Sequence, residues 1–173
     1  KPVNPFNIKL GNPIKISNWL EQYASSTNNI SNFSYNDNKI LLSKSRKLSK
    51  LSSTTKHYSR KIVFYKDNLI SYDHKGKVFL YSLSLNKKIF EYNFYKKNFK
   101  NFKKEINFIV KENILYAADN LGYLYALNLD KKSIVWAKNY GIPFRSNLKL
   151  SNNQIFLANQ DNAIYSINSA TGD

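Results

Sequence analysis

The sequence of 173 residues contains no cysteine, and it has only two histidines, five glycines and four prolines. Without cysteine, a disulfide framework, a thiolate metal site and a cysteine nucleophile are all excluded among these residues. The glycines stand singly, so no glycine-rich loop is present to cradle a phosphate group. Neither His57 nor His74 has a serine or aspartate partner that the repeat would place beside it, as a catalytic base requires. We therefore predict no catalytic residue, no cofactor and no metal site.

Acidic residues are also scarce. Asp and Glu total 11 against 27 Lys and Arg, which gives a net charge of +16. The abundant residues include Lys, Asn, Ile, Tyr and Phe, all of which can be written with AT-rich codons. A bias in the base composition of the genome therefore explains the positive charge without any selection for a partner that requires it. The alternatives are an anionic membrane surface, an acidic partner or a nucleic acid, and we expect no nucleic acid. No apolar run approaches the ~20 residues of a membrane span.

A hairpin in the second half of the chain provides the main structural signal. Residues 113–136 alternate apolar and polar side chains around a turn at 119–122, as expected of two strands joined by a tight turn. Such a hairpin cannot bury its apolar face alone, so further copies are expected. Residues 69–90 superpose on 115–136 without a gap, which places Asp73, Gly76 and Phe90 each 46 positions before Asp119, Gly122 and Trp136.

A third copy runs over residues 153–173 at a spacing of 40, with Asn159 in place of the Asp, Asn162 in place of the Gly, and Gly172 in a second turn. Gly and Asn both tolerate the positive φ that such a turn requires. A period of roughly forty residues with four strands per unit is typical of a β-propeller blade. The sequence therefore predicts an all-β chain, a partial β-propeller of about three to four four-stranded blades.

The expected division of the chain follows from composition and repeats. Residues 1–18 hold three of the four prolines and are predicted to form an extended N-terminal tail. Residues 19–173 form the propeller, with blades at 39–94, 95–140 and 141–173, the last one incomplete.

The repeated residues are interpreted as structural. Asp73, Asp119 and Asn159 occupy one place in three copies, where a side-chain oxygen accepts backbone N–H bonds of the turn. A catalytic carboxylate would instead be needed at a single asymmetric site. Phe90 and Trp136 also repeat, and we predict that they pack adjacent blades together.

Residues that do not repeat are therefore the candidates for function. Arg145 has no counterpart in the other copies and follows Phe144 at a crossing between blades. An exposed aromatic ring beside an arginine is a reasonable partner anchor, so we predict partner binding by Phe144 and Arg145; an arginine that only stabilises the local turn is the alternative. The basic loop at 44–61 and the Lys–Phe alternation at 95–104 would contact nucleic acid in another reading, but we interpret them as connections between blades.

The repeats resemble the pyrroloquinoline-quinone-type propeller repeat, whose pattern is roughly V-Y-x-x-D-x-x-G-x-L-x-A-L-D-x-x-T-G-x-x-x-W. Residues 115–128 and Trp136 match it closely, and Ser-Ala-Thr-Gly at 169–172 matches its second turn. Quinone enzymes of this family stack the cofactor on a tryptophan and usually add adjacent cysteines and calcium-binding carboxylates. This sequence shows no such arrangement, so the resemblance implies the fold without the cofactor. A quinone-dependent dehydrogenase is the first alternative function, and a basic nucleic-acid-binding propeller is the second.

A narrower resemblance covers about residues 18–173. Asn18-Trp19, Asn28-Asn29-Ile30, the blades and the crossing at 141–146 look like the N-terminal portion of the alphaproteobacterial BamB family, propeller lipoproteins of the outer-membrane β-barrel assembly machinery. The resemblance implies an eight-bladed propeller at the periplasmic face of the cell outer membrane, held at the inner leaflet by a lipid anchor outside this chain. It also implies a non-enzymatic scaffold that binds the barrel-forming subunit through inter-blade loops.

Overall fold

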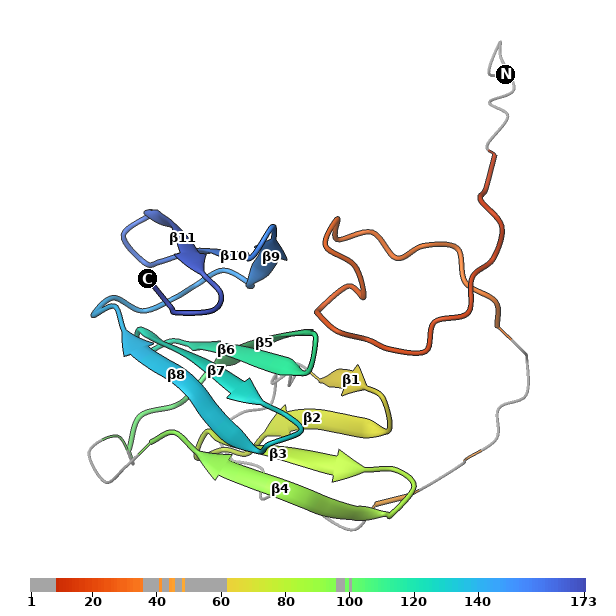
Figure 1. Ribbon diagram of the computed structural model, residues 1–173, viewed down its shortest axis with the longest axis horizontal. Coiled ribbons are helices and arrows are strands. Elements are labelled where there is room, and N and C mark those ends of the chain that lie inside the picture. The colour runs from red at the N-terminus through yellow and green to blue at the C-terminus, as the bar shows by residue number, and fades with distance from the viewer. Residues whose placement is uncertain are drawn as a thin grey trace.

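The computed structural model describes residues 9–35, 41, 44, 45, 48, 62–95, 99 and 101–173. These residues form strands, turns and irregular segments, with no α-helix among them. Accordingly, no helix in the described part of the chain is long and apolar enough to cross a membrane. The strands form three antiparallel sheets that lie side by side (Figure 1).

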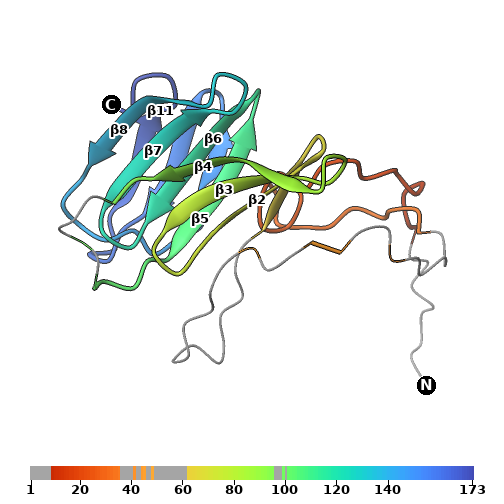
Figure 2. The same ribbon diagram turned by 90° about the horizontal axis from the view of Figure 1, so that it is seen from below.

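Each sheet is a meander in which strands adjacent in the chain pair with one another. The first sheet consists of β1 (Val63–Tyr65), β2 (Asn68–Tyr72), β3 (Lys77–Ser82) and β4 (Lys87–Asn93). The second consists of β5 (Ile106–Lys111), β6 (Ile114–Asp119), β7 (Tyr123–Asn128) and β8 (Ser133–Asn139). The third consists of β9 (Lys149–Ser151), β10 (Gln154–Ala158) and β11 (Ile164–Asn168). The sheets stack face against face (Figure 2), as consecutive propeller blades do.

Residues with a left-handed backbone form the turns between first and second strands in the second and third sheets. Asn152 and Asn153 join β9 to β10 with φ values of 46° and 62°, and Glu112 and Asn113 join β5 to β6 with 49° and 66°. Positive φ at both central residues defines the type I′ turn, whose twist matches that of the flanking strands. Asparagine suits this conformation because its short polar side chain bonds locally.

The repeat extends to an irregularity of the sheets. The pairing of β3 with β4 shifts register between Leu80 and Tyr81, and that of β7 with β8 shifts between Ala126 and Leu127. These two positions are 46 residues apart. A bulge bends its strand and increases the local twist, so the outer strands of both blades bend at the same place.

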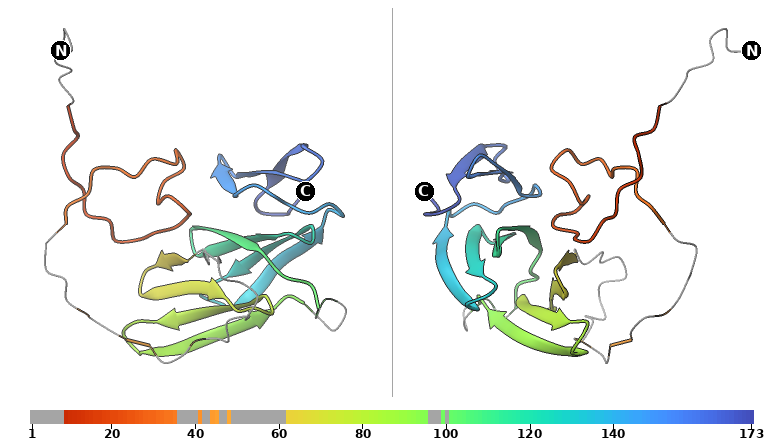
Figure 3. Two further views of the ribbon diagram at one scale, coloured as in Figure 1. Left: turned by 180° about the vertical axis from the view of Figure 1, so that it is seen from behind. Right: turned by 45° about the vertical axis from the view of Figure 1, so that its right-hand side comes forward.

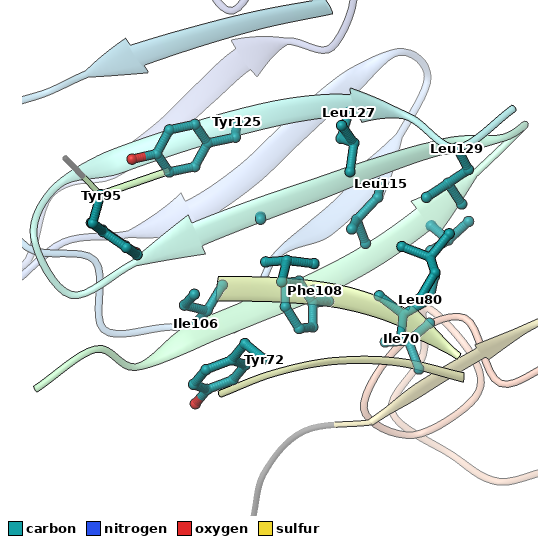
Figure 4. Close-up of a cluster of buried hydrophobic side chains, with 14 residues drawn as sticks. Ile70, Tyr72, Leu80, Tyr95, Ile106, Phe108, Leu115, Tyr125, Leu127 and Leu129 are labelled. Atoms are coloured by element: carbon teal, nitrogen blue, oxygen red, sulfur yellow. The ribbon is translucent and has the colours of Figure 1, made fainter. Parts of the chain in front are cut away.

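The apolar core lies between the sheets. Ile70, Leu115 and Leu127 are fully buried between the first and second sheets (Figure 4). Leu124 and Ile155 are fully buried between the second and third sheets. Burying each such side chain contributes about 1.5–3 kcal/mol. Because these residues are covered by a neighbouring blade, each blade depends on the next one for its stability.

The N-terminal segment lies against the first strands of the blades. Trp19 exchanges two backbone hydrogen bonds with Phe64 of β1, at 2.7 and 2.8 Å, and the N–H of Val110 in β5 donates to the carbonyl of Leu20 at 3.0 Å. β1 and β5 also contact each other, whereas the sheets spread apart toward β4 and β8. Figure 3 shows the segment on the inner side of the sheets, beside β1, β5 and β9. The segment therefore occupies the side on which a propeller has its central channel.

Part of the predicted organisation lies outside the described residues. This applies to residues 1–8 of the predicted tail and to 36–61, apart from residues 41, 44, 45 and 48, which includes the start of the first predicted blade and most of the basic loop. The boundaries proposed for the tail and the blades stay predictions.

Candidate functional site

Three equivalent polar residues hold the turns between second and third strands. The Oδ1 atoms of Asp73, Asp119 and Asn159 each accept N–H bonds from the backbone two and four positions further on, at 2.8–3.0 Å. This pattern needs only an oxygen on a short side chain, which is why Asn can replace Asp. Each of the three side chains therefore stabilises its own turn.

The turn glycines are required by space as well as by backbone conformation. Gly76 and Gly122 have φ values of +80° and +87°, and Asn162 takes the third place with 62°. A Cβ atom on Gly76 would lie 2.3 Å from a ring carbon of Tyr95, and one on Gly122 would lie 3.0 Å from the carbonyl oxygen of Ile142. The crossing into the next blade thus packs directly on each glycine.

The repeated aromatic residues differ between the two blade junctions. Trp136 packs on Gly172 of the third blade, where a Cβ atom would lie 2.7 Å from the ring, and its indole N–H donates to the Ser169 carbonyl at 3.0 Å. At the first junction the ring is Phe90, which packs against the core between the blades. There the counterpart of Gly172 is Lys132, so the tryptophan-on-glycine contact is specific to the second junction.

A buried polar cluster at the first junction was not predicted from the sequence. The hydroxyl of Tyr95 donates to Oδ2 of Asp119 at 2.6 Å, and Asp119 is 1% exposed. Lys104 is also buried, and its ammonium group donates a hydrogen bond to the Phe99 carbonyl. The Nζ atom lies 5.2 Å from the centre of the Tyr95 ring. The sequence signal for this longer crossing is the period of 46 rather than 40 residues.

Burial controls the protonation of this cluster. It raises the pKa of Asp119 more than the hydrogen bonds from Tyr95 and the turn lower it. It also raises the pKa of the Tyr95 hydroxyl, with the Asp119 carboxylate adding to the effect. Burial lowers the pKa of Lys104, which the nearby carboxylates of Asp73 and Asp119 oppose. The cluster joins the two blades and offers no paired nucleophile and base.

We expect Asp119→Asn to remove part of the pH dependence of stability. Because the pKa of Asp119 is raised above its ordinary 3.8 in the folded chain, protonation favours folding, and this contribution is lost as the pH rises from that value through the raised pKa. Asparagine keeps the turn acceptor, as Asn159 does. Urea titrations between about pH 3.5 and 7 should show the original chain losing stability relative to the variant as the pH rises; parallel profiles would contradict the prediction.

The structure separates the two residues predicted to bind a partner. Phe144 is 4% exposed and makes edge-on contacts with Tyr140 and Tyr165, with ring centres 5.5 and 6.1 Å apart. The prediction of an exposed aromatic ring at this position is therefore wrong, because the core between the second and third blades takes up the ring. Arg145 is exposed, and within the described part of the chain its guanidinium has no hydrogen-bond or ion-pair partner.

Backbone hydrogen bonds hold Arg145 in place. Its N–H donates to the Ala158 carbonyl at 3.0 Å, and the N–H of Gln160 donates to the Pro143 carbonyl at 2.9 Å. The crossing is thereby tied to the turn between β10 and β11, with the Phe144 ring anchored beneath it. Arg145 thus stands on a fixed loop on the same side of the molecule as the three polar turns.

The other candidate chemistry is sparse in the described residues. His74 is exposed at the tip of its hairpin, and His57 lies outside the described residues. No group of three or more His, Asp or Glu side chains suited to a metal ion occurs where the structure describes the chain. At the inner side of the blades, the buried Glu21 pairs with the ammonium of Lys149 in β9, which also donates to the Ser25 carbonyl at 3.3 Å.

Comparisons with known proteins identify the fold. No protein-family model matches the chain, and no curated protein matches it. BamB from Moraxella catarrhalis is similar in structure, with a TM-score of 0.50 and 21% identity over 68% of this chain and 32% of that one. The quinohemoprotein alcohol dehydrogenase ADHIIG from Pseudomonas putida HK5 is also similar, with a TM-score of 0.53 and 10% identity. The match covers 68% of this chain and 20% of the dehydrogenase. The computationally designed Ika4 protein matches with a TM-score of 0.53 and 14% identity, over 75% of this chain and 77% of Ika4.

The chain therefore has the fold of a partial β-propeller, as predicted, and this fold is similar to that of BamB. It spans about a third of the length of the BamB structure. Because BamB and an alcohol dehydrogenase share this architecture, the fold does not choose between a scaffold and an enzyme. The choice rests on the residues of this chain.

Proposed function

We propose that the chain belongs to a non-enzymatic scaffold of the outer-membrane β-barrel assembly machinery and binds the barrel-forming subunit through loops on one face of the propeller. The observation that carries this proposal is Arg145, an exposed guanidinium without a partner among the described residues, held on a fixed crossing between two blades. Arginine is enriched among the residues that dominate binding energy at protein interfaces, and a fixed loop loses little conformational entropy when it binds.

The rest of the chain supports a scaffold. Asp73 and Asp119, its recurrent carboxylates, are engaged in turn hydrogen bonds, so they are not free for acid–base work. The sequence resemblance to alphaproteobacterial BamB and the structural likeness to BamB of Moraxella catarrhalis support this proposal. The scaffold would lie at the periplasmic face of the cell outer membrane, held at the inner leaflet by a lipid anchor outside this chain.

We expect Arg145→Glu to weaken capture of the periplasmic region of the barrel-forming subunit by about tenfold or more, because the substitution reverses the charge at the proposed contact. Lys131→Glu is the matched control: Lys131 is exposed in the turn between β7 and β8, at the opposite ends of the strands. Both variants should keep the unfolding curve of the original chain. Binding can be measured by surface plasmon resonance with the purified subunit.

Two results would reject the proposed role. Equal capture by the original chain and the Arg145→Glu variant would exclude Arg145 as a contact. The dehydrogenase alternative would replace the scaffold if two results came together. Neither the original chain nor the variants would capture the subunit, and reconstitution with a quinone and calcium would produce a bound chromophore.

A further inference from the structure

The first blade junction departs from the repeat and is more open at its rim. At the second junction Trp136 packs on Gly172 and the remaining pocket measures about 310 Å³, whereas the first junction has Phe90 and Lys132 in these places. A groove of about 570 Å³ lies between the outer strands of the first and second blades. Its size falls within the range of protein ligand sites, roughly 300–1,000 Å³.

Aromatic side chains form the walls of this groove. Tyr92 and Phe94 line it from the first blade, and Tyr123 and Tyr125 line it from the second. The rings of Phe94 and Tyr125 stack with centres 3.8 Å apart, and those of Tyr123 and Tyr125 stack at 5.7 Å. Ala137 leaves space on the β8 side. These walls favour an apolar or aromatic side chain as the occupant.

The strand beside the groove has a free edge. β4 is the last strand in the order of the first sheet, and no other described strand pairs with its outer side. It is seven residues long, so it offers a row of backbone N–H and C=O groups to an extended peptide. Tyr92 of β4 points into the groove, and neighbouring residues of a strand point to opposite faces. Alternate side chains of an added strand would therefore enter the groove.

The opposite face of β4 carries a positive balance of charge. Lys77 and Lys88 both pair with Glu91, at 2.8 and 2.6 Å, so two ammonium groups share one carboxylate. The side chains of an added strand that do not enter the groove would lie near these lysines. Acidic residues complement that charge.

We propose that the β4 edge and the adjoining aromatic groove bind an extended peptide in which aromatic and acidic side chains alternate. The peptide adds a strand to the first sheet, its rings enter the groove against Tyr92 and Tyr123, and its carboxylates face Lys77 and Lys88. This site lies on the rim of the propeller, whereas Arg145 lies on the loop face. It does not depend on the function proposed above.

The absence of native cysteine permits a direct test. Ala137→Cys places a single thiol in the groove, and Val135→Cys places one on the same strand outside it, where Val135 is 51% exposed. Each variant is folded first and then alkylated with a bulky maleimide, and the unmodified variant is the reference. A labelled peptide of about ten alternating Asp and Phe residues is titrated by fluorescence anisotropy.

We expect saturable binding that alkylation weakens by about tenfold or more at position 137 and less than about twofold at position 135. A peptide with Lys in place of Asp should bind more weakly, as should one whose alternate backbone nitrogens are methylated. Absence of saturable binding, or equal binding after alkylation at position 137, would overturn the site. Equal binding of the methylated peptide would overturn strand addition.

Discussion

Replacing Gly76 with alanine is expected to lower the free energy of unfolding by about 3 kcal/mol, the sum of a left-handed backbone and an overpacked contact. At φ +80° an alanine is strained wherever it stands, and here its Cβ atom would also lie 2.3 Å from Tyr95 and 2.9 Å from Lys104. Tyr95 cannot move away cheaply, because its hydroxyl donates to the buried Asp119. The substitution therefore strains the junction between the first two blades.

Gly141 provides the matched control for this experiment. It has a similar φ of +77°, but a Cβ atom there would meet nothing within 4 Å. Gly141→Ala should therefore lower the free energy of unfolding only by the cost of the left-handed backbone, about 1–2 kcal/mol. Urea unfolding of the two variants measures the difference directly. Equal losses of stability would mean that contact with the crossing contributes nothing and that backbone conformation alone selects glycine at position 76.

Replacing Trp136 with alanine is expected to lower the free energy of unfolding by about 3 kcal/mol, the lower end for removal of a large aromatic ring. The lower end applies because Trp136 is only partly buried. The loss combines the contact of the ring with Gly172 and the hydrogen bond to the Ser169 carbonyl at 3.0 Å. Because these contacts belong to the third blade, that blade should detach before the first two unfold.

Trp136→Phe tests how much of this loss depends on the size of the ring. It keeps a smaller aromatic ring but loses the indole hydrogen bond and part of the six-membered ring that contacts Gly172, so we expect a smaller cost than for alanine, about 1–2 kcal/mol. Val135→Ala, at a half-exposed neighbouring position, should change stability by less than about 0.5 kcal/mol. Hydrogen exchange of β9 to β11 would report detachment of the third blade. Unchanged protection of these strands in Trp136→Ala would show that Trp136 does not dock the blade.

The candidate partner site was predicted only in part. Arg145 could be selected because it breaks the repeat, and a departure from a repeat is visible in the sequence alone. Phe144 was assigned the wrong environment because nothing local distinguishes an exposed ring from a buried one; its burial follows from Tyr140 and Tyr165, which pack against it. The groove beside β4 could not be predicted from the sequence, because it forms where the first junction lacks the tryptophan-on-glycine contact of the second.

The sequence by itself determined the blade and its turns. A spacing of 46 or 40 residues and the alternation within each copy imply the strands, and the hydrogen bonds of Asp73, Asp119 and Asn159 reach only two and four positions along the chain. Such interactions depend on residue type and spacing, so they can be predicted before the chain is packed.

Only the tertiary structure decided the contacts between distant segments. The bond between Tyr95 and Asp119 spans 24 residues, and the bond between Glu21 and Lys149 spans 128. The N-terminal segment could not be placed on the inner strands from its own pattern, because its pairing with β1 and β5 appears only when the blades converge. Burial and charge pairing across such separations depend on how the sheets pack, and therefore the partner face and the rim groove had to be read from the folded chain.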